Sequence, residues 1–174
     1  MAELTREDVE NYLRTGRGLA TLDYSGLDLR GLDFQDQCLD GSNFSGANLA
    51  GDNLGGASLQ HCVLEEANLG ETILIHADLR GSRLHRANLS QALVREAVLA
   101  ACDLSGADLS QADLRKASLV GANLKGANFQ GADLRQALLL EVDLNEARFG
   151  EAKLEGVVLG FGVELPSAVT GTLS

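Results

Sequence analysis

The sequence of 174 residues contains no tryptophan, a single proline and few aromatic residues, which make up 4% of the chain. A core made from Leu and Ala at fixed spacing can still bury much apolar surface, so order does not require aromatic residues. No stretch approaches the roughly 20 consecutive apolar residues that a membrane-spanning helix needs. The N-terminal segment MAELTREDVENYLR is charged throughout and lacks the apolar run of a secretory signal. We expect a soluble, cytoplasmic protein.

Basic residues are also scarce, with 14 Lys and Arg against 25 Asp and Glu and a formal net charge of −11. Nucleic acids and anionic membranes are usually bound through clustered positive charge. The composition therefore predicts no direct nucleic-acid partner and no membrane partner. It favours partners that are basic, or that normally bind something acidic.

What the sequence does contain is one five-residue unit, copied along most of its length. Residues 121–134, GANLKGANFQGADL, give the pattern: a small residue, then Asp or Asn, then Leu or Phe. If the large apolar residue is called the centre of each unit, 28 centres follow one another without interruption from Tyr24 to Leu159. Leu occupies 22 of these centres, and Ala stands two residues before the centre in 16 units. Such strict repetition indicates a repeat architecture rather than a globular core.

The period of five selects the kind of repeat. It fits neither the 3.6-residue period of a helix nor the two-residue period of a strand, so neither element keeps every fifth residue on one side. A chain that turns a corner once per unit does keep it there. In such a chain the centre and the small residue two before it point inward, and the two residues after the centre make the corner.

The motif A-(D/N)-L-x-x resembles that of the pentapeptide-repeat family, and the resemblance covers residues 22–161. It implies an all-β fold, a right-handed quadrilateral parallel β-helix of about seven four-sided coils, each of about 20 residues. At about 4.8 Å per coil the rod would be about 34 Å long. In this arrangement we expect the side chains of Asn43, Asn48 and Asn53 to hydrogen-bond to the backbone of the corners.

Both ends of the chain depart from the repeat. Residues 1–21 predict a capping helix, because Thr5 and Asp8 have the spacing of a helix start and Gly16 and Gly18 supply a stop. We expect the face formed by Val9, Tyr12 and Leu13 to lie over the first coil.

In the first units Leu replaces the usual Ala, which either adds apolar bulk facing the cap or simply widens the coil. Residues 162–174 predict a C-terminal cap or tail. The apolar side chains near this end can cover the last coil, and the proline prevents further edge pairing. The residues concerned are Leu22, Leu27 and Leu32 at the first coil, and Phe161, Val163, Leu165, Val169 and Pro166 at the last.

Residues that could carry chemistry do not converge in this scheme. Cys62 and Cys102 fall in inward slots two coils apart, about 9.6 Å, which is too far for a disulfide, and Cys38 points outward without a partner. The three histidines, His61, His76 and His85, are spread over different sides. We therefore predict no enzyme activity, no metal, no cofactor and no small-molecule substrate.

Two groups of outward residues stand out when positions 20 residues apart are stacked. The first is an arginine row, Arg95, Arg115 and Arg135, on one side of three successive coils. Asp113 and Asp133 fall on the same side, so the row is either a self-neutralising ladder or a patch for an acidic partner.

The second group is an apolar cluster on the next side of the rod. Its members are expected to face outward, because neighbouring residues already fill the inward slots. We interpret the cluster as an interface, rimmed by Arg80, Glu141 and Glu155, and the alternative is that the tail folds back over it. The apolar cluster consists of Val98, Val120, Leu138, Leu140 and Val158, and Ile73, Ile75 and Leu93 form a smaller group on the side of the arginine row.

These observations predict a non-catalytic module for protein–protein interaction. The partner is either another protein or a second copy, including a homodimer through a side or an end of the β-helix. The resemblance adds an alternative, since some pentapeptide-repeat proteins are acidic mimics of DNA that bind and modulate a type II topoisomerase such as DNA gyrase. The net charge agrees with this alternative, whereas the scatter of the acids over all four sides weakens it.

Overall fold

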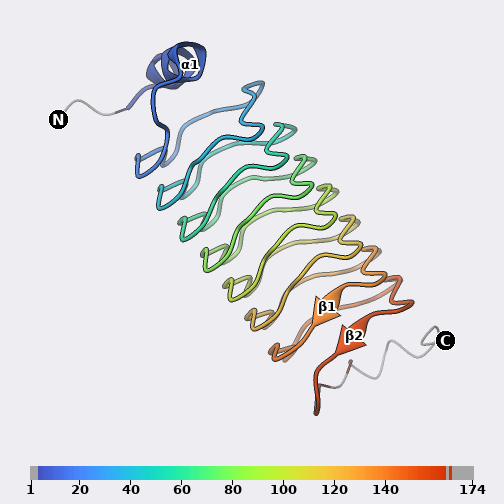
Figure 1. Ribbon diagram of the computed structural model, residues 1–174. Coiled ribbons are helices and arrows are strands. Elements are labelled where there is room, and N and C mark those ends of the chain that lie inside the picture. Colours follow the sequence, from blue (N-terminus) through green and yellow to red (C-terminus); the bar gives the residue numbers. More distant parts are fainter. Residues whose placement is uncertain (1–3, 164, 166–174) are drawn as a thin grey trace.

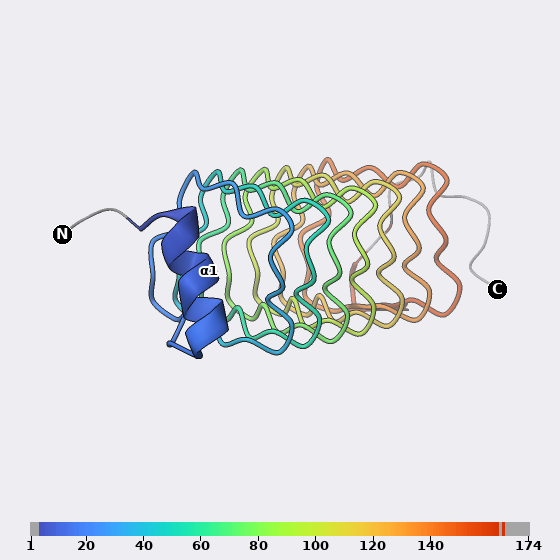
Figure 2. The ribbon, with the colours of Figure 1, turned by 90° about the horizontal axis from the view of Figure 1, so that it is seen from above.

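The computed structural model describes residues 4–163 and 165, in which a rod-shaped β-solenoid follows a single N-terminal helix (Figure 1). Helix α1 spans Arg6–Thr15. Within the described residues only two segments form regular strands, β1 at Leu138–Leu139 and β2 at Val158–Leu159. The chain between α1 and β2 winds as stacked coils, which Figure 2 shows from above.

Successive coils pair in parallel with a register of 20 residues. Asp23 bridges to Asn43, and the pattern continues at every unit to the bridge between Asp133 and Lys153. The same register joins β1 to β2, where Leu138 pairs with Val158. The regular strands are so few because only three extended residues separate one corner from the next. Each side of a coil is therefore a single bridge rather than a long strand.

In a unit that has Asp or Asn before the centre and a coil on either side, every backbone amide has its own acceptor, as residues 102–106 illustrate. One amide closes the preceding turn, one bonds to the coil before, two bond to the coil after, and the fifth bonds to a side chain within the unit. The donors and acceptors are Cys102 N and Leu99 O (3.2 Å), Asp103 N and Ser82 O (3.0 Å), Leu104 N and Asn123 O (2.9 Å), Gly106 N and Lys125 O (2.9 Å), and Ser105 N and Asp103 Oδ1 (3.1 Å).

The fifth bond explains the Asp or Asn before the centre. In all 16 units that carry one, its side-chain oxygen accepts the amide two residues further on, at 2.9–3.3 Å. This local bond is the Asx-turn that these two residue types favour. The backbone role predicted for Asn43, Asn48 and Asn53 is confirmed.

The corners share one backbone conformation regardless of residue type. In every unit but the last, the second residue after the centre has a positive φ, and it is Gly in 12 of these units and another residue in 15. The turn is closed when the carbonyl of the centre accepts the amide three residues further on, as Tyr24 O accepts Leu27 N at 3.1 Å. The third residue of such a turn needs a positive φ. A non-glycine residue there costs roughly 1–2 kcal/mol. Stacking of the coils therefore imposes the corner, and glycine is not required for it.

The core is a column of centres and small residues. Centres such as Leu104 are fully buried, and so are the alanines two residues before them. Aromatic centres stack between coils, with Tyr24 and Phe44 at 4.5 Å between ring centroids. All three cysteines are free, and Cys62 and Cys102 are buried as predicted.

Helix α1 lies within the predicted segment 1–21, between the predicted start signal at Thr5 and stop at Gly16, and it packs on the solenoid. Thr5 and Asp8 form a reciprocal capping box, and Gly16 ends the helix in the left-handed conformation. The side chain of Arg6 donates to the backbone carbonyl of Asp28 in the first coil, at 2.8 Å. That the helix blunts the edge of the first coil stays a prediction. Val9 is buried in the core, and Tyr12, Leu13, Leu22, Leu27 and Leu32 are partly buried against it.

The end of the repeat differs from expectation. Val163 and Leu165 are partly buried against the core. Phe161, however, is fully exposed, so the prediction that it covers the last coil is wrong. It stands second after the centre Leu159, but it lacks the positive φ of the other corners, which falls on Gly162 instead. The predicted roles of Pro166 and Val169 lie outside the described residues.

One inward slot of the repeat holds a charged residue, Asp52, which is only 2% exposed. Its Oδ1 accepts the amide of Gly31 at 2.6 Å, whereas its Oδ2 is buried without a hydrogen-bond partner among the described residues. Burial raises the pKa of Asp52 to about 6, against the lowering effect of the Gly31 amide and the charge of Arg6. Thr72, which follows it in the same slot, donates its hydroxyl to Leu69 O.

We predict that Asp52→Ala stabilises the protein at neutral pH and not in acid. Because the folded-state pKa lies above the usual 3.8, the unfolded chain loses its proton first, and stability falls as pH rises from about 4 to 6. A shift of about two units corresponds to about 3 kcal/mol. Thermal unfolding at pH 4, 5, 6 and 7.5 should show the gain of the variant appearing across this interval. Thr72→Ala is the control, and an equal pH dependence in both variants would contradict the assignment.

We also predict that Leu104→Asp is far more damaging than Asp103→Ala. The first change buries a carboxylate in the core column and should cost more than about 4 kcal/mol. The second removes hydrogen bonds to Ser105 and Asn123 and should cost about 1–2 kcal/mol. Chemical denaturation of both variants measures the difference. Equal losses would mean that the inward and outward assignments are wrong.

Candidate functional site

The described residues contain no group of three His, Cys, Asp or Glu side chains placed to hold a metal ion. The histidines lie apart: the imidazole of His61 lies across the corner at Gly81, His76 is 3.7 Å from Glu96, and His85 contacts Ser105. In the same part of the chain, no helix is both long and apolar enough to cross a membrane.

A Ser–His–Asp group that sequence reasoning missed does form on one side of the rod. The hydroxyl of Ser105 is 2.6 Å from Asp103 and 2.9 Å from Nδ1 of His85. Burial raises the pKa of Asp103, but the hydrogen bonds from Ser105 outweigh it and the pKa lies below its usual value. Ser105 donates its hydroxyl proton to Asp103, so His85 is not placed to take that proton as a general base. The group therefore lacks the Ser-to-His-to-Asp order of hydrogen bonds that a nucleophilic triad needs. It could have been found by pairing positions 20 residues apart.

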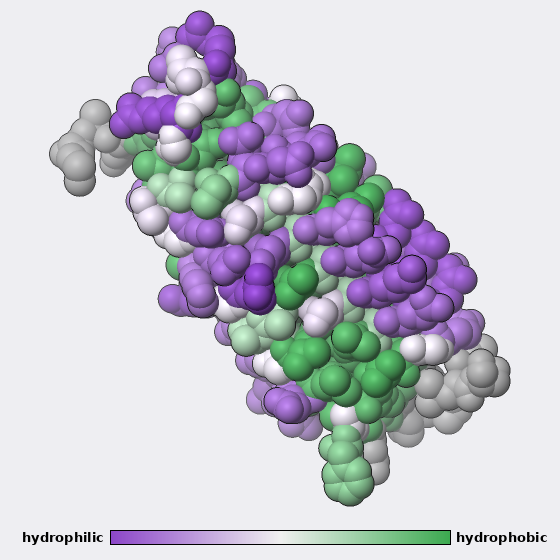
Figure 3. Space-filling view, in the orientation of Figure 1, coloured by the Kyte–Doolittle hydropathy of each residue, from purple (hydrophilic) through white to green (hydrophobic). Residues whose placement is uncertain are grey.

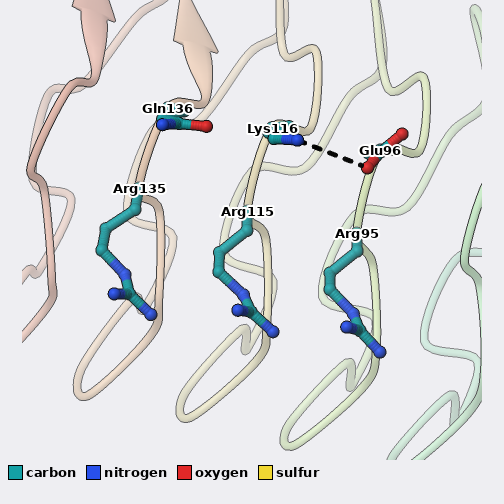
Figure 4. A pocket seen from close by; sticks show the side chains of 6 residues that line it. All are labelled: Arg95, Glu96, Arg115, Lys116, Arg135 and Gln136. Atoms are coloured by element: carbon teal, nitrogen blue, oxygen red, sulfur yellow. Dashed lines mark ion pairs between the residues drawn. The ribbon is translucent and has the colours of Figure 1, made fainter.

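The three side chains of the arginine row lie parallel in successive coils (Figure 4). Together with Glu96, Lys116 and Gln136 they line a groove of about 350 Å³ at a corner of the rod. Arg115 forms a two-point bond with Asp113, at 2.8 Å for both contacts, and Arg135 forms the same bond with Asp133. We call the arginine row together with Lys116 the basic corner.

The charges of the basic corner are linked but not fully balanced. The guanidinium groups of Arg115 and Arg135 lower the pKa values of Asp113 and Asp133, so both carboxylates are ionised at neutral pH. Arg95 has Leu93 where the next two coils have Asp. Its Nε is buried without a hydrogen bond, 3.4 Å from the already bonded Asp113, and the rest of the side chain is partly exposed.

Lys116 is 3.8 Å from Glu96, which also lies near His76. Four cations therefore meet three carboxylates within 4.0 Å, namely Asp113, Asp133 and Glu96. Glu155 takes the next place in the row, and its negative charge raises the pKa of Arg135. The row is therefore compensated at its Glu155 end, and the positive charge is least compensated at Arg95.

The apolar cluster lies on the side of the rod that contains β1 and β2, where Figure 3 shows hydrophobic side chains gathered beside hydrophilic rows. The inward slots of these coils are filled by buried residues such as Leu119 and Leu139, so the cluster is not part of the core. Val158 is 46% exposed, and the other four members are partly exposed. The structure thus places all five predicted residues on one surface.

This side differs from the other three in its lack of Asx-turns. Of the seven residues that precede its centres, only Asp78 can accept the corner amide in this way. The other three sides carry the remaining 15 Asp and Asn residues. On the β1/β2 side the residues before the centres are Cys38, Ser58, Asp78, Val98, Ser118, Leu138 and Val158.

The basic corner and the apolar cluster are neighbours. Arg95 and Val98 are three residues apart on either side of one turn, and the same holds for Arg135 and Leu138. The corner and the cluster therefore run side by side along the rod over the same coils. Sequence stacking predicted both groups of residues, but not which arginine keeps unpaired donors, because that depends on side-chain geometry.

Comparison with known proteins agrees with this architecture. Rfr23, a pentapeptide repeat protein from the cyanobacterium Cyanothece 51142, is 24% identical over 86% of this chain and 96% of its own, with a TM-score of 0.50. This likeness concerns the fold alone. HetL, involved in heterocyst differentiation regulation in Nostoc sp. strain PCC 7120, is 22% identical over 92% of this chain and 99% of its own, with a TM-score of 0.37.

QnrB1, a plasmid-mediated fluoroquinolone resistance protein, is 24% identical over 83% of this chain and 78% of its own, with a TM-score of 0.46. No curated protein matches the sequence. The family model described as pentapeptide repeats matches in eight copies, over residues 28–65, 53–91, 95–131 and 122–160. The chain belongs to the pentapeptide-repeat family.

Proposed function

We propose that this protein is a non-catalytic module for protein–protein interaction and that the apolar cluster is its working surface. The observation that carries the proposal is the cluster of five outward aliphatic side chains on four successive coils, next to inward slots that are already filled. An apolar middle with a polar rim is the composition of a protein interface. A contiguous apolar patch on a soluble protein marks a contact more often than it serves the fold.

The distribution of Asx-turns supports the same surface. Each such bond contributes roughly 1 kcal/mol, and a solvent-facing Asp or Asn would supply it at Val98, Leu138 and Val158. Folding therefore gains nothing from aliphatic residues at these three positions. A contact that uses their side chains accounts for their presence.

The alternative function, mimicry of DNA towards a type II topoisomerase, is not favoured by the contacts of the acids. Asp28, Asp78, Asp113 and Asp133 are each held by an arginine two residues on, which leaves no uniform row of free carboxylates on one side. We expect a gyrase supercoiling assay to show no effect, and inhibition at low micromolar concentration would favour the alternative.

We predict that Leu138→Ser combined with Leu140→Ser abolishes binding without unfolding the protein. Both side chains face outward, so the free energy of unfolding should change by no more than about 1 kcal/mol. Self-association or capture of a partner from the native host should weaken at least tenfold, about 1.4 kcal/mol. Sedimentation velocity and affinity capture measure this, and thermal unfolding monitors the fold.

The matched control is Ile73→Ser combined with Ile75→Ser, which makes the same change on either side of a centre on the neighbouring side. It should leave self-association and capture unchanged. If the Leu138 and Leu140 variant unfolds at much lower temperature and the wild type is a monomer that captures nothing, the residues belong to the core or to a docking site for the tail.

A further inference from the structure

The chemistry of the partner is constrained by what lies beside the apolar cluster. The chain carries a net charge of −11, yet the corner along one edge of the cluster holds four cations, Arg95, Arg115, Lys116 and Arg135. Arg115 and Arg135 are engaged by aspartates through Nε and Nη2, which leaves Nη1 of each available. At Arg95 no aspartate of the same coil is present, because Leu93 takes its place.

We propose that the apolar cluster and the basic corner together bind an acidic amphipathic helix of a partner protein. This inference rests on the proposed function and specifies the partner's chemistry. The helix would lie along the rod with its apolar ridge on Val98, Val120, Leu138, Leu140 and Val158. Glutamate or aspartate residues on one flank of the helix would meet the basic corner, with the two Nη groups of the partly exposed Arg95 as the strongest anchor.

The repeat distances of the two elements agree. Residues three or four apart on a helix advance 4.5–6.0 Å along its axis, at about 1.5 Å per residue. Successive coils of the rod advance about 4.8 Å. Each step along the ridge of the helix therefore reaches the next coil, and the four coils of the cluster match about three helical turns. An apolar ridge seated on an apolar surface is a recurring mode of peptide recognition.

Charge complementarity favours an acidic helix over a second copy or a basic segment. A second copy would bring its own acidic surface against acids such as Glu141 and Glu155 at the rim. A basic segment would meet the excess positive charge at Arg95. A segment with carboxylates on the flank that faces Arg95 and Arg115 gains from the local charge and keeps clear of Glu141 at the opposite edge of the cluster. Glu155 follows Arg135 in the row, so the carboxylates would have to end before that coil.

The experiment uses three synthetic helical peptides with an identical leucine ridge and a flank of Glu, Gln or Lys. Binding to the full-length protein is measured by fluorescence anisotropy at low and at physiological salt. The Glu peptide should bind at least tenfold more tightly than the Gln peptide, and salt should reduce the difference. The overall charge of the protein favours the Lys peptide, so a preference for Glu reports the local corner.

Two pairs of substitutions separate local charge from bulk charge. Arg95→Gln with Lys116→Gln should reduce the affinity of the Glu peptide to that of the Gln peptide. Lys125→Gln with Arg86→Gln is the control, since these residues hold the same first and second positions after a centre on another side and change the net charge equally. The control should change the affinity by less than about twofold, which is within about 0.4 kcal/mol.

The outcomes distinguish the two proposals. Equal binding of the Glu and Gln peptides, tightest binding of the Lys peptide, or equal effects of the two substitution pairs would overturn the acidic partner and leave the apolar interface standing. Failure of all three peptides to bind, together with a homodimer that Leu138→Ser and Leu140→Ser dissociate, would identify a second copy as the occupant and overturn the helix. If Leu138→Ser and Leu140→Ser leave peptide binding unchanged, the interface itself is wrong.

Discussion

The hydrogen bond from a corner amide to the Asp or Asn two residues before it is the interaction on which the rest of the structure depends. Neighbouring coils and the turn itself provide acceptors for four amides of each five-residue unit, and the fifth has none in the backbone. Each such bond contributes roughly 1 kcal/mol. Over 16 units the sum, roughly 16 kcal/mol, is comparable with the whole stability of an ordinary domain, about 5–15 kcal/mol. Backbone pairing therefore explains the Asp or Asn of the motif, although the 12 units without one lack this bond.

The same bond divides the surface into residues that serve the fold and residues that do not. Where Asp or Asn precedes the centre, the side chain is held in its own turn and often by an arginine, as at Asp113. Where an aliphatic residue stands instead, the backbone bond is given up and the side chain is free for contact. The β1/β2 side has a single Asx-turn, at Asp78, and carries the apolar cluster. Lower local stability and a candidate interface therefore occur at the same positions.

The period of five predicted one corner in each unit, and the resemblance to the pentapeptide-repeat family supplied the four-sided closure. Together they give a register of 20 residues, which converts sequence spacing directly into spatial neighbours. It placed the arginine row, the apolar cluster and the buried Cys62 and Cys102 correctly. It did not predict the buried carboxyl of Asp52, since pattern alone treats that slot as apolar. Phe161 was misplaced because the regular spacing ends there and no further coil defines its orientation. The donors that Arg95 leaves unpaired depend on its rotamer and on Leu93, which stands where the next two coils have Asp. A consensus pattern of the repeat contains neither.

A rod that is acidic overall gains selectivity from a single corner of the opposite sign. Most of the surface would repel the proposed acidic helix, so the net charge of the rod opposes docking on the other three sides. The basic corner favours docking on the β1/β2 side. The fixed coil spacing holds the arginines and the aliphatic side chains in one arrangement before the partner arrives, which reduces the entropy lost on binding. Bonds between coils, Asx-turns and the buried column maintain this arrangement, so outward residues that form no Asx-turn can change without disturbing it. On the proposed mode of binding, partner choice is therefore a property of one side and its corner rather than of the fold.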